Sequence, residues 1–490
     1  MSVKLELKTW GNFIGGKWVP STSGKIKPNI NPANAEEILG YFQESSFEDV
    51  KNAVESAEKA FYDWKRLPAP NRGKLLVKVM QILEKRKEEV SEALTREEGK
   101  SFQESLGEVN KALNTLEFFA GEGRRFYGET IPSELPKNFI YTRREPLGVV
   151  ALITPWNFPV SIPIWKMAAS LICGNTVVLK PSSLTPWTAV LLMEAFREAD
   201  FPAGVVNCIT GSGSVIGDAL VKAPEVKAVS FTGSTETGRK LQALAGQHGK
   251  PIQLEMGGKN AVIVLNDADL DLAASAAALG AFGSTGQRCT ATSRVIVEES
   301  ALEQFTQKIV EKAKLMSDSL GPCVDENQLK KVLQYIEVGK NEGGKLVCGG
   351  HRLKDSKHLK GFYVESTVFS HVTSDMRIAK EEVFGPVLSV LSAKNLSDAL
   401  KLANGVEYGL SASIFTQDAE KVFEFIDEIE VGMVHINSAT IGGEAQVPFG
   451  GMKNSGMGGR EMGKQALDFF TEWKAVYVDY TGSSRKTNFY

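Results

Sequence analysis

Two spacings of apolar residues alternate along the chain and predict two kinds of element. Between Phe47 and Lys100 apolar residues recur three and four positions apart with charges between them, which predicts helices, and the pattern continues to about Phe119. Beyond residue 145 the chain holds short apolar runs between helical segments, namely GVVALITP, NTVVLKP, GVVNCITG, VKAVSFTG and NAVIVLND. Such runs are typical of a parallel sheet covered on both faces. The sequence therefore predicts an α/β fold with a doubly wound sheet.

Two stretches differ from this alternation. The polar stretch GEGRRFYGETIPSELPKNFIYTRREPLG has extended character and interrupts the helical pattern, so we expect an arm or linker there. The C-terminal FTEWKAVYVDY reads as an apolar strand, and an exposed strand needs a pairing partner such as a neighbouring subunit. A second α/β block begins near Gly257 and continues to Asn437.

Composition excludes several classes of protein. The apolar and charged fractions, 42% and 23%, are those of a globular chain, and 56 Lys and Arg against 59 Asp and Glu leave no field that favours nucleic acid or an anionic membrane. No apolar run is long enough for a membrane helix, and the N-terminus lacks a signal-peptide pattern, so we expect a cytoplasmic protein. The five cysteines are widely spaced without a CxxC pair, and no Cys/His cluster has zinc spacing, so we expect reduced thiols and no metal site.

One of the cysteines has unusual surroundings. Small and polar residues flank Cys289 in FGSTGQRCTATSR, and Arg288 precedes it, which predicts an accessible, electropositive loop that favours a thiolate. Taken alone, a packed cysteine is the commoner case. Cys173, Cys208 and Cys348 fit that case because their neighbours are mostly apolar or glycine.

Two further segments hold polar side chains where a ligand could reach them. Glu255 ends an extended run just before a Gly-Gly pair, where a carboxylate can face a cleft, although a surface glutamate is the commoner case. Asn157 follows the run GVVALI, and open parallel sheets bind ligands at the carboxyl ends of their strands. Its amide could donate to a developing oxyanion, although Asn is also common in turns.

The glycine pattern of a standard dinucleotide site, GxGxxG, is absent. The nearest runs are GSGSVIG at Gly211–Gly217, one residue too long, and GSTETG at Gly233–Gly238 after an apolar run. Either could place a helix N-terminus against a phosphate, but such loops are weak evidence alone.

Taken together and in order, TPWNFP, TVVLKPSSLTP, FTGSTETG, LEMGGKN, GQRCTATSR, EEVFGP and PFGGMKNSG resemble the aldehyde dehydrogenase superfamily over nearly the whole chain. The resemblance implies a Rossmann-like cofactor domain (residues 1–123 and 146–256), an α/β catalytic domain (257–453) and a small β oligomerisation arm (124–145 and 467–490). It also implies a homodimer or homotetramer, and a dinucleotide held without the standard fingerprint.

The resemblance assigns a mechanism to three of these residues. It implies that Cys289 is the nucleophile that forms a thiohemiacetal and then a thioester, that Asn157 and the Cys289 N–H hold the oxyanion, and that Glu255 activates the hydrolytic water. Relatives that pass the acyl group to coenzyme A lack a glutamate at this position, so Glu255 favours a free acid product. A catalytically idle relative is the alternative class, and the joint presence of the three residues argues against it.

For the cofactor, the resemblance implies either NAD or NADP. Because Ser183 stands where NAD-preferring relatives often carry a glutamate that repels a 2′-phosphate, and Lys180 is a nearby cation, we expect NADP to be accepted. The full set of expected cofactor contacts is Ile153, Thr154, Pro155, Trp156, Lys180, Ser182, Ser183, Gly213, Gly217, Phe231, Gly233, Ser234, Thr237, Met256, Gly257, Glu382 and Phe384.

For the substrate, the resemblance implies a small aldehyde that carries a negative charge. Lys111 and Arg288 occupy positions that are cationic in relatives with anionic substrates, although both could simply be solvated. The other expected contacts are Phe158, Trp165, Thr290 and Phe449. Within the superfamily, LEMGGKN, STGQRCTATSRVIV and PIWKMA most resemble enzymes that oxidise 2,5-dioxopentanoate (α-ketoglutaric semialdehyde). Succinate semialdehyde, glyceraldehyde 3-phosphate without phosphorylation, and a broad range of aldehydes are the alternatives.

One departure from the family pattern lies between Lys314 and Gln328. The chain reads LMSDSLGPCVDEN there, which is shorter than the usual segment, so a contact to the cofactor or to a neighbouring loop is expected to differ.

Overall fold

The periodic N-terminal region folds into four helices, three of which have one end set by a capping residue. They are α1 (Phe47–Arg66), α2 (Ala69–Lys85), α3 (Lys87–Glu98) and α4 (Phe102–Glu122). Ser46 and Ser101 form capping boxes at the starts of α1 and α4, and α3 ends at Gly99, whose φ of 99° is left-handed. The computed structural model describes residues 7–484.

The first four of the apolar runs after residue 145 lie at the centre of an eight-stranded sheet, in the order β22-β12-β11-β8-β9-β10-β2-β3. Strands β12, β11, β8, β9 and β10 are mutually parallel. Their bounds, with those of the antiparallel edge strands, are β8 (Val149–Ile153), β9 (Thr176–Lys180), β10 (Val206–Cys208), β11 (Val226–Thr232), β12 (Ile252–Glu255), β22 (Gly456–Met457), β2 (Asn12–Ile14) and β3 (Lys17–Val19).

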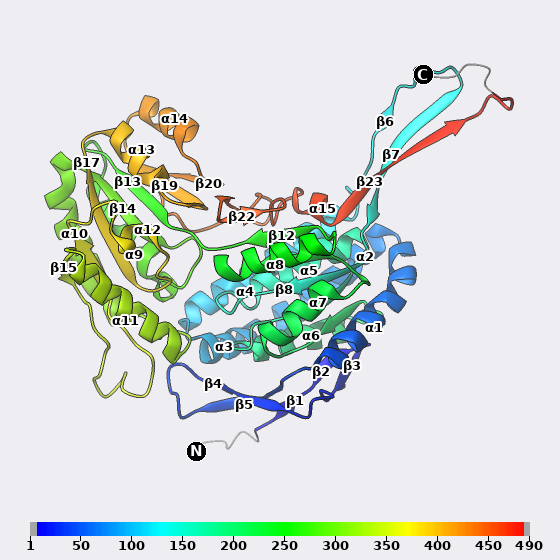
Figure 1. Cartoon of the computed structure of the whole chain (residues 1–490), viewed down its shortest axis with the longest axis horizontal. Helices are drawn as coiled ribbons and strands as arrows, with labels where there is room; N and C mark the ends of the chain where they lie inside the picture. Colours follow the sequence, from blue (N-terminus) through cyan, green and yellow to red (C-terminus); the bar gives the residue numbers. More distant parts are fainter. Residues whose placement is uncertain (1–6, 485–490) are drawn as a thin grey trace.

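Helices cover both faces of this sheet because its central strands are apolar on both sides. One face packs against α2, α4, α5 (Ser161–Cys173) and α6 (Pro186–Glu198), and the other against α1, α7 (Asp218–Lys222) and α8 (Thr235–Gln247). Figure 1 shows these layers in the centre of the molecule.

The second α/β block forms a seven-stranded sheet, in the order β15-β16-β17-β14-β13-β19-β20, parallel except at β15. Its strands are β13 (Asn260–Val264), β14 (Thr292–Glu298), β15 (Lys345–Cys348), β16 (Thr367–Ser370), β17 (Val387–Ala393), β19 (Ser411–Phe415) and β20 (Met433–Ile436). One face packs against α9 (Leu270–Phe282) and α10 (Leu302–Ser317). The other packs against α11 (Glu326–Asn341), α12 (Arg377–Lys380), α13 (Leu396–Asn404) and α14 (Ala419–Glu428).

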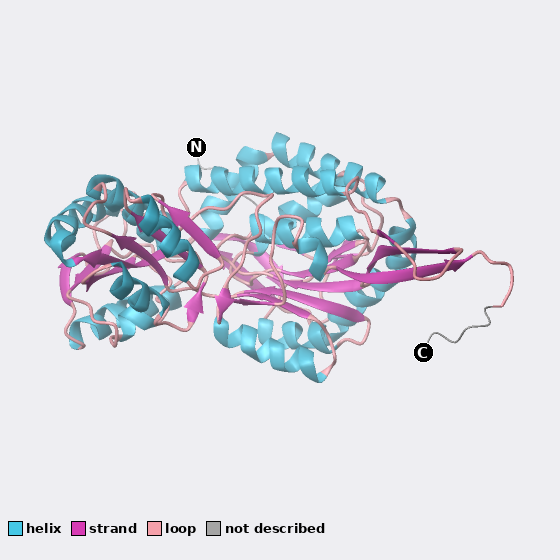
Figure 2. Cartoon of the chain, turned by 90° about the horizontal axis from the view of Figure 1, so that it is seen from above, coloured by secondary structure: helices cyan, strands magenta, loops and turns pink. Residues whose placement is uncertain are grey.

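The interrupting stretch and the C-terminal strand pair with each other. β23 (Thr471–Asp479) lies antiparallel to β7 (Asn138–Pro146), which also pairs with β6 (Thr130–Ile131). This three-stranded arm projects from the body of the molecule, as Figures 1 and 2 show. The remaining short elements are β1 (Thr9–Trp10), β4 (Ile26–Ile30), β5 (Ile38–Gln43), β18 (Tyr408–Gly409), β21 (Met452–Lys453) and α15 (Ala466–Phe469).

The predicted α/β class is confirmed, and all five quoted apolar runs are strands. The last of them, NAVIVLND, is β13 of the seven-stranded sheet. The domain boundaries stay a prediction, and residues 1–6 and 485–490, which that prediction included, lie outside the described residues. Among residues 7–484, no helix is both long enough and apolar enough to span a membrane.

Candidate functional site

The three residues expected to do the chemistry come together where the two large sheets meet. Asn157 follows β8, Glu255 is the last residue of β12, and Cys289 stands in the loop that leads into β14. Glu255 and Cys289 line a cavity of about 270 Å³, here called cavity A. Asn157 and Cys289 line a second cavity of about 150 Å³, cavity B. Cys289 therefore belongs to both cavities.

Glu255 is a buried carboxylic acid to which no side chain donates a hydrogen bond. Its side chain is 2% exposed, and the backbone N–H of Gly451 is close enough to lower its pKa against the larger, opposite effect of burial. Burial, and then the negative charge of Glu461, raise the pKa of Glu255 well above its ordinary value. Glu461 also lines cavity A, and it accepts hydrogen bonds from Lys166 Nζ and, at 3.3 Å, from Thr232 Oγ1. Oε1 of Glu461 is thus engaged by Lys166 and Thr232, whereas no side chain donates to either oxygen of Glu255, which can bind a proton or a water molecule.

The surroundings of Cys289 differ from those expected. Burial raises the pKa of the thiol to about 12, and the carboxylates of Glu255 and Glu382 add to the effect, which opposes the thiolate that the flanking residues favour. Arg288 is engaged elsewhere: its Nη2 donates to Ser284 Oγ at 2.8 Å and lies 3.5 Å from Glu104 Oε1.

The backbone around Cys289 is held by neighbouring amides. Asn260 Nδ2 donates to the carbonyl oxygens of Cys289 and Ala291, both at 2.8 Å. Asn157 Nδ2 donates to the carbonyl oxygen of Gln287 at 3.0 Å, which leaves the second N–H of this amide for another acceptor. The loop is thus fixed from both sheets.

All six residues expected to contact the substrate line cavity A: Lys111, Phe158, Trp165, Arg288, Thr290 and Phe449. The Nζ atom of Lys111 lies 4.5 Å from the ring centroid of Trp165 and 5.9 Å from that of Phe449. Burial lowers the pKa of Lys111 to about 8. The cavity therefore holds a cation between aromatic walls.

About half of the expected cofactor contacts line cavity B: Pro155, Trp156, Gly233, Ser234, Met256, Gly257, Glu382 and Phe384. Glu382 lies tightly against the backbone, because the Gly258 N–H donates to its Oε1 at 2.9 Å, and a Cβ on Gly257 would come within 2.3 Å of its Oε2. Ser234 caps α8, whose N-terminus offers N–H groups to an anion. A close backbone approach and a free helix end fit a dinucleotide.

The other expected cofactor contacts do not line cavity B. Lys180 is buried, donates to the carbonyl oxygen of Pro181 at 2.8 Å, and has its pKa lowered to about 8 by burial. A Cβ on Gly213 would lie 3.8 Å from Lys180 Cε, so these two residues are neighbours. The residues outside the cavity are Ile153, Thr154, Lys180, Ser182, Ser183, Gly213, Gly217, Phe231 and Thr237.

Several lining residues were missed by the sequence analysis. Cavity B also includes Ile162, Thr232, Gln328 and Lys331, and cavity A includes Glu104, Glu108 and Glu461. Gln328 ends the shortened segment, and its Nε2 donates to the carbonyl oxygen of Phe384 at 2.7 Å. No local pattern indicates such long-range partners, although the spacing of three between Gln328 and Lys331 places them on one side of α11.

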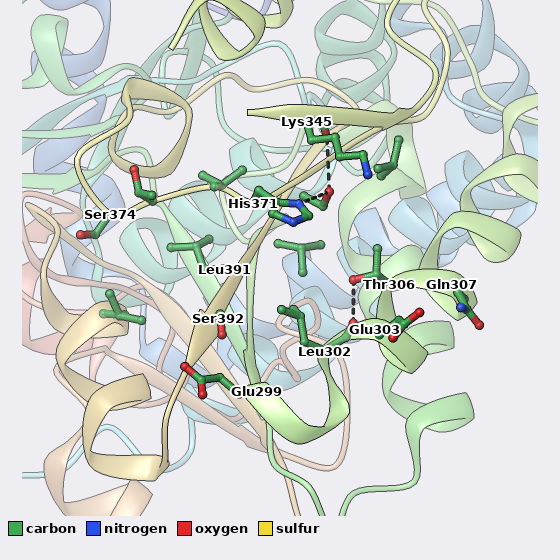
Figure 3. Close-up of a pocket in the computed structure, with 16 residues that line it drawn as sticks. Glu299, Leu302, Glu303, Thr306, Gln307, Lys345, His371, Ser374, Leu391 and Ser392 are labelled. Atoms are coloured by element: carbon green, nitrogen blue, oxygen red, sulfur yellow. Dashed lines mark hydrogen bonds between the residues drawn. The ribbon is translucent and has the colours of Figure 1, made fainter. Parts of the chain in front are cut away.

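A larger cavity, of about 820 Å³, lies elsewhere (Figure 3). Its lining includes Glu299, Ser370 and Ser392, at or near the carboxyl ends of β14, β16 and β17, whereas Cys289 precedes the start of β14. Figure 3 shows His371 and Lys345 on one side and Leu302, Glu303 and Thr306 on the other. None of the expected site residues lines it. Among the described residues, no group of three or more His, Cys, Asp or Glu could hold a metal ion.

The chain is similar to known proteins over nearly its full length. Residues 18–476 match the model of the aldehyde dehydrogenase family. The chain is 48% identical to the alpha-ketoglutaric semialdehyde dehydrogenase of Bacillus subtilis, over 98% of this chain and all of that protein. It is 45% identical to the 2,5-dioxopentanoate dehydrogenase of Saccharolobus solfataricus, over 95% and 98% of the two chains. The crystal structure of betaine aldehyde dehydrogenase from Staphylococcus aureus in complex with NAD+ superposes with a TM-score of 0.94 at 34% identity, over 97% and 96% of the chains.

Proposed function

Because the chain belongs to the aldehyde dehydrogenase family and oxidises an aldehyde with a nicotinamide dinucleotide, we propose that Cys289, Asn157 and Glu255 perform the reaction and that 2,5-dioxopentanoate is the substrate. The observation that carries the catalytic assignment is that Cys289 lines two adjoining cavities, one with Glu255 and the aromatic walls and the other with Asn157 and Glu382.

The first step joins the aldehyde to the protein. After the thiol has passed its proton to a water molecule in the cavity, the sulfur of Cys289 bonds to the carbonyl carbon, and the carbonyl oxygen becomes an oxyanion. The free N–H of Asn157 Nδ2 donates to that oxyanion, and the hydrogen bond from the same amide to Gln287 O keeps it oriented. Asn157 thus stabilises charge that exists only after the sulfur has added.

The second step releases the acid. A nicotinamide dinucleotide with its nicotinamide end in cavity B would supply the hydride acceptor, and the thioester would then remain on Cys289. Glu255 then takes a proton from a water molecule as the water oxygen bonds to the acyl carbon, and the C–S bond breaks to return the Cys289 thiolate. The carboxylate of Glu255 supports this role, because no other side chain competes for it by hydrogen bonding.

The residues that would hold the dinucleotide surround cavity B and extend along the carboxyl ends of β9 and β11. Glu382 and Phe384 would hold the nicotinamide half, and the N-terminus of α8 at Ser234 would face a phosphate. The Gly257 site supports this assignment because a side chain there would displace the Glu382 carboxylate from its place against the backbone.

The substrate assignment follows from the charge in cavity A. 2,5-Dioxopentanoate carries a carboxylate at the end opposite its aldehyde, and two of the relatives are named for this compound. Arg288 already faces the carboxylate of Glu104, whereas Lys111 stands among aromatic rings without an ion-pair partner among the described residues. We therefore assign the substrate carboxylate to Lys111.

A comparison of three aldehydes tests the proposal. The ratio kcat/KM is measured for 2,5-dioxopentanoate, succinate semialdehyde and uncharged pentanal on one preparation, following reduced nicotinamide. We expect 2,5-dioxopentanoate to exceed pentanal by about tenfold or more, which corresponds to about 1.4 kcal/mol of transition-state stabilisation. Equal values for the acid and pentanal would contradict an anionic substrate, and a clear preference for succinate semialdehyde would contradict the five-carbon assignment.

Replacing Lys111 by methionine is expected to remove the preference for the acid. The ratio kcat/KM for 2,5-dioxopentanoate should fall by about tenfold, while that for pentanal changes less than about twofold. In the parent enzyme the preference should fall as the pH rises through about 8, because deprotonation of Lys111 removes its charge. Lys59→Met, on the exposed side of α1, is the control. An unchanged preference for the acid in Lys111→Met would contradict this role of Lys111 and would indicate that Arg288 binds the substrate carboxylate.

For the cofactor we propose that NADP is accepted. Ser183 carries no charge that would repel a 2′-phosphate. Replacing Ser183 by glutamate is expected to lower kcat/KM for NADP by about tenfold and to leave that for NAD within about twofold. Ser183→Gln has nearly the same shape without the charge and is the control. Equal losses for both dinucleotides in Ser183→Glu would show that the position does not discriminate between them.

We also propose that the chain assembles as a homodimer or homotetramer through its arm. Trp473 and Tyr477 lie on the same face of β23 and are 54% and 69% exposed, and β23 is an edge of its sheet. Light scattering from the purified chain tests this proposal, since the mass of a single chain would contradict it.

A further inference from the structure

Charged residues recur every three or four positions along one side of α4, beginning at Lys100 just before the helix. This side faces the loops that hold Asn157 and Cys289. Glu104, Glu108 and Lys111 line cavity A, and Lys100 lies one turn before Glu104. Lys111 has a place in substrate binding, but Lys100 and Glu104 have no role in the reaction described above.

Lys100 connects α4 to the loop of Asn157. Its Nζ donates to the backbone carbonyl oxygen of Asn157 and, at 2.6 Å, to Glu108 Oε2, and it lies 3.8 Å from the ring centroid of Phe158. The side chains of Lys100 and Glu108 are almost completely buried. Because a buried charge is stable only with its partners, the Lys100 ammonium holds Asn157 O and the Glu108 carboxylate at fixed positions.

Glu108, on the same helix, binds the other end of the segment that begins at Asn157. Its Oε1 accepts hydrogen bonds from the N–H groups of Val160 at 2.9 Å and Ser161 at 3.1 Å, at the start of α5. The pair Lys100 and Glu108 thus holds the segment 157–161 at both ends.

Glu104 connects α4 to the loop of Cys289. Ser284 and Thr285 have φ values of 48° and 56°, a left-handed conformation that residues with a side chain rarely adopt. Glu104 Oε1 accepts hydrogen bonds from Ser284 N at 2.5 Å and Ser284 Oγ at 3.2 Å. Since these bonds exist only when the turn has this shape, they stabilise the strained backbone that leads to Cys289.

We infer that Lys100 and Glu104 are positioning residues: Lys100 sets the place of the Asn157 amide, and Glu104 sets the turn that presents Cys289. This inference rests on the proposed roles of Asn157 and Cys289. One helix thereby fixes the distance between the oxyanion donor and the nucleophile, which come from different sheets.

A double-mutant cycle tests the part played by Lys100. We expect Lys100→Met to lower kcat for pentanal by about tenfold, with KM for the dinucleotide within about twofold of the parent value. In the Asn157→Ala background the same substitution should change kcat by less than about twofold, because the amide that it displaces is already gone. An equal loss in both backgrounds would overturn the inference. If Asn157→Ala alone keeps full activity, the proposed oxyanion role fails instead.

Glu104 gives an independent test that does not depend on removing a buried cation. Glu104→Ala is expected to lower kcat for pentanal by about tenfold and to change the rate at which iodoacetamide alkylates Cys289, whereas Glu104→Gln keeps an acceptor for Ser284 N and should recover most of both values. Glu117→Ala, exposed on the same helix, is the control. Parent values of kcat and alkylation rate in Glu104→Ala, or equal losses in Glu104→Ala and Glu104→Gln, would overturn the inference.

Discussion

Replacing Cys289 by serine is expected to lower kcat for aldehyde oxidation by about 10⁴-fold or more. A serine hydroxyl is a far weaker nucleophile than a thiolate, and its neighbour Glu255 has a raised pKa and does not hydrogen-bond to residue 289. The substitution removes no hydrogen bond that the backbone of residue 289 makes, so the fold and dinucleotide binding should persist. Rates are measured from reduced nicotinamide, and binding from the quenching of tryptophan fluorescence.

The control for this prediction is another cysteine. Cys348 lies in β15, is partly exposed, and lines neither cavity A nor cavity B. Cys348→Ser should keep parent activity. Activity of Cys289→Ser within tenfold of the parent would mean that another group forms the covalent bond, and the proposed mechanism would be wrong.

Replacing Glu255 by glutamine is expected to leave the first turnover and to block the later ones. The dinucleotide can still be reduced once on each subunit, but the thioester lacks the base that activates water, so steady turnover should fall by about 10²- to 10⁴-fold. A stopped-flow trace should therefore show a burst of about one reduced nicotinamide per subunit, and mass spectrometry should find the acyl group on Cys289. Loss of the burst itself would place Glu255 in the first step instead.

The pH dependence of thioester hydrolysis tests the role of Glu255 as the base. Glu255 can take a proton from water only when it is ionised, and burial together with Glu461 raises its pKa well above the ordinary value. The rate of thioester hydrolysis should therefore rise with pH through this raised pKa, and the rise should be absent in Glu255→Gln. Glu311→Gln, exposed on α10, should keep the parent profile. A profile already flat from pH 5 upward would contradict a raised pKa.

Local patterns allowed much of the fold and of the reaction centre to be predicted. The apolar runs are strands because burial on both faces requires apolar residues at successive positions, and this requirement acts within each segment. The six substrate contacts that the family resemblance implied all line cavity A, although Glu104, Glu108 and Glu461 of the same cavity were missed.

The electrostatic surroundings of Cys289 could not be predicted in this way. Arg288 is adjacent in sequence, which suggested a positive field, but its guanidinium faces Glu104 from a helix far away in the chain. The carboxylates that do act on the thiol, Glu255 and Glu382, come from distant segments as well. A pKa depends on all nearby charges and on burial, and neither is contained in the sequence next to the residue.

The role of α4 was hidden for a related reason. The segment TREEGKSFQESLGEVNKAL has the charges of a solvated helix, yet Glu97, Glu98, Lys100 and Glu108 are all buried. Their partners, such as Thr188, Asn157 and Val160, are backbone groups of other elements. Nearly every residue type has the same backbone N–H and C=O groups, so the sequence does not show which of them will pair with a charge. A pattern of side chains therefore cannot reveal that such charges point inward.

The division of the reaction centre between two sheets has a consequence for how the protein fails when it is heated. Glu255 ends a strand of one sheet, Cys289 precedes a strand of the other, and residues 256–259 connect β12 to β13. A few degrees of rotation between the sheets would separate the two side chains without breaking any ladder hydrogen bond. Thermal inactivation is therefore expected to precede the loss of helix and strand content, and a ligand that bridges the sheets is expected to delay the first event more than the second.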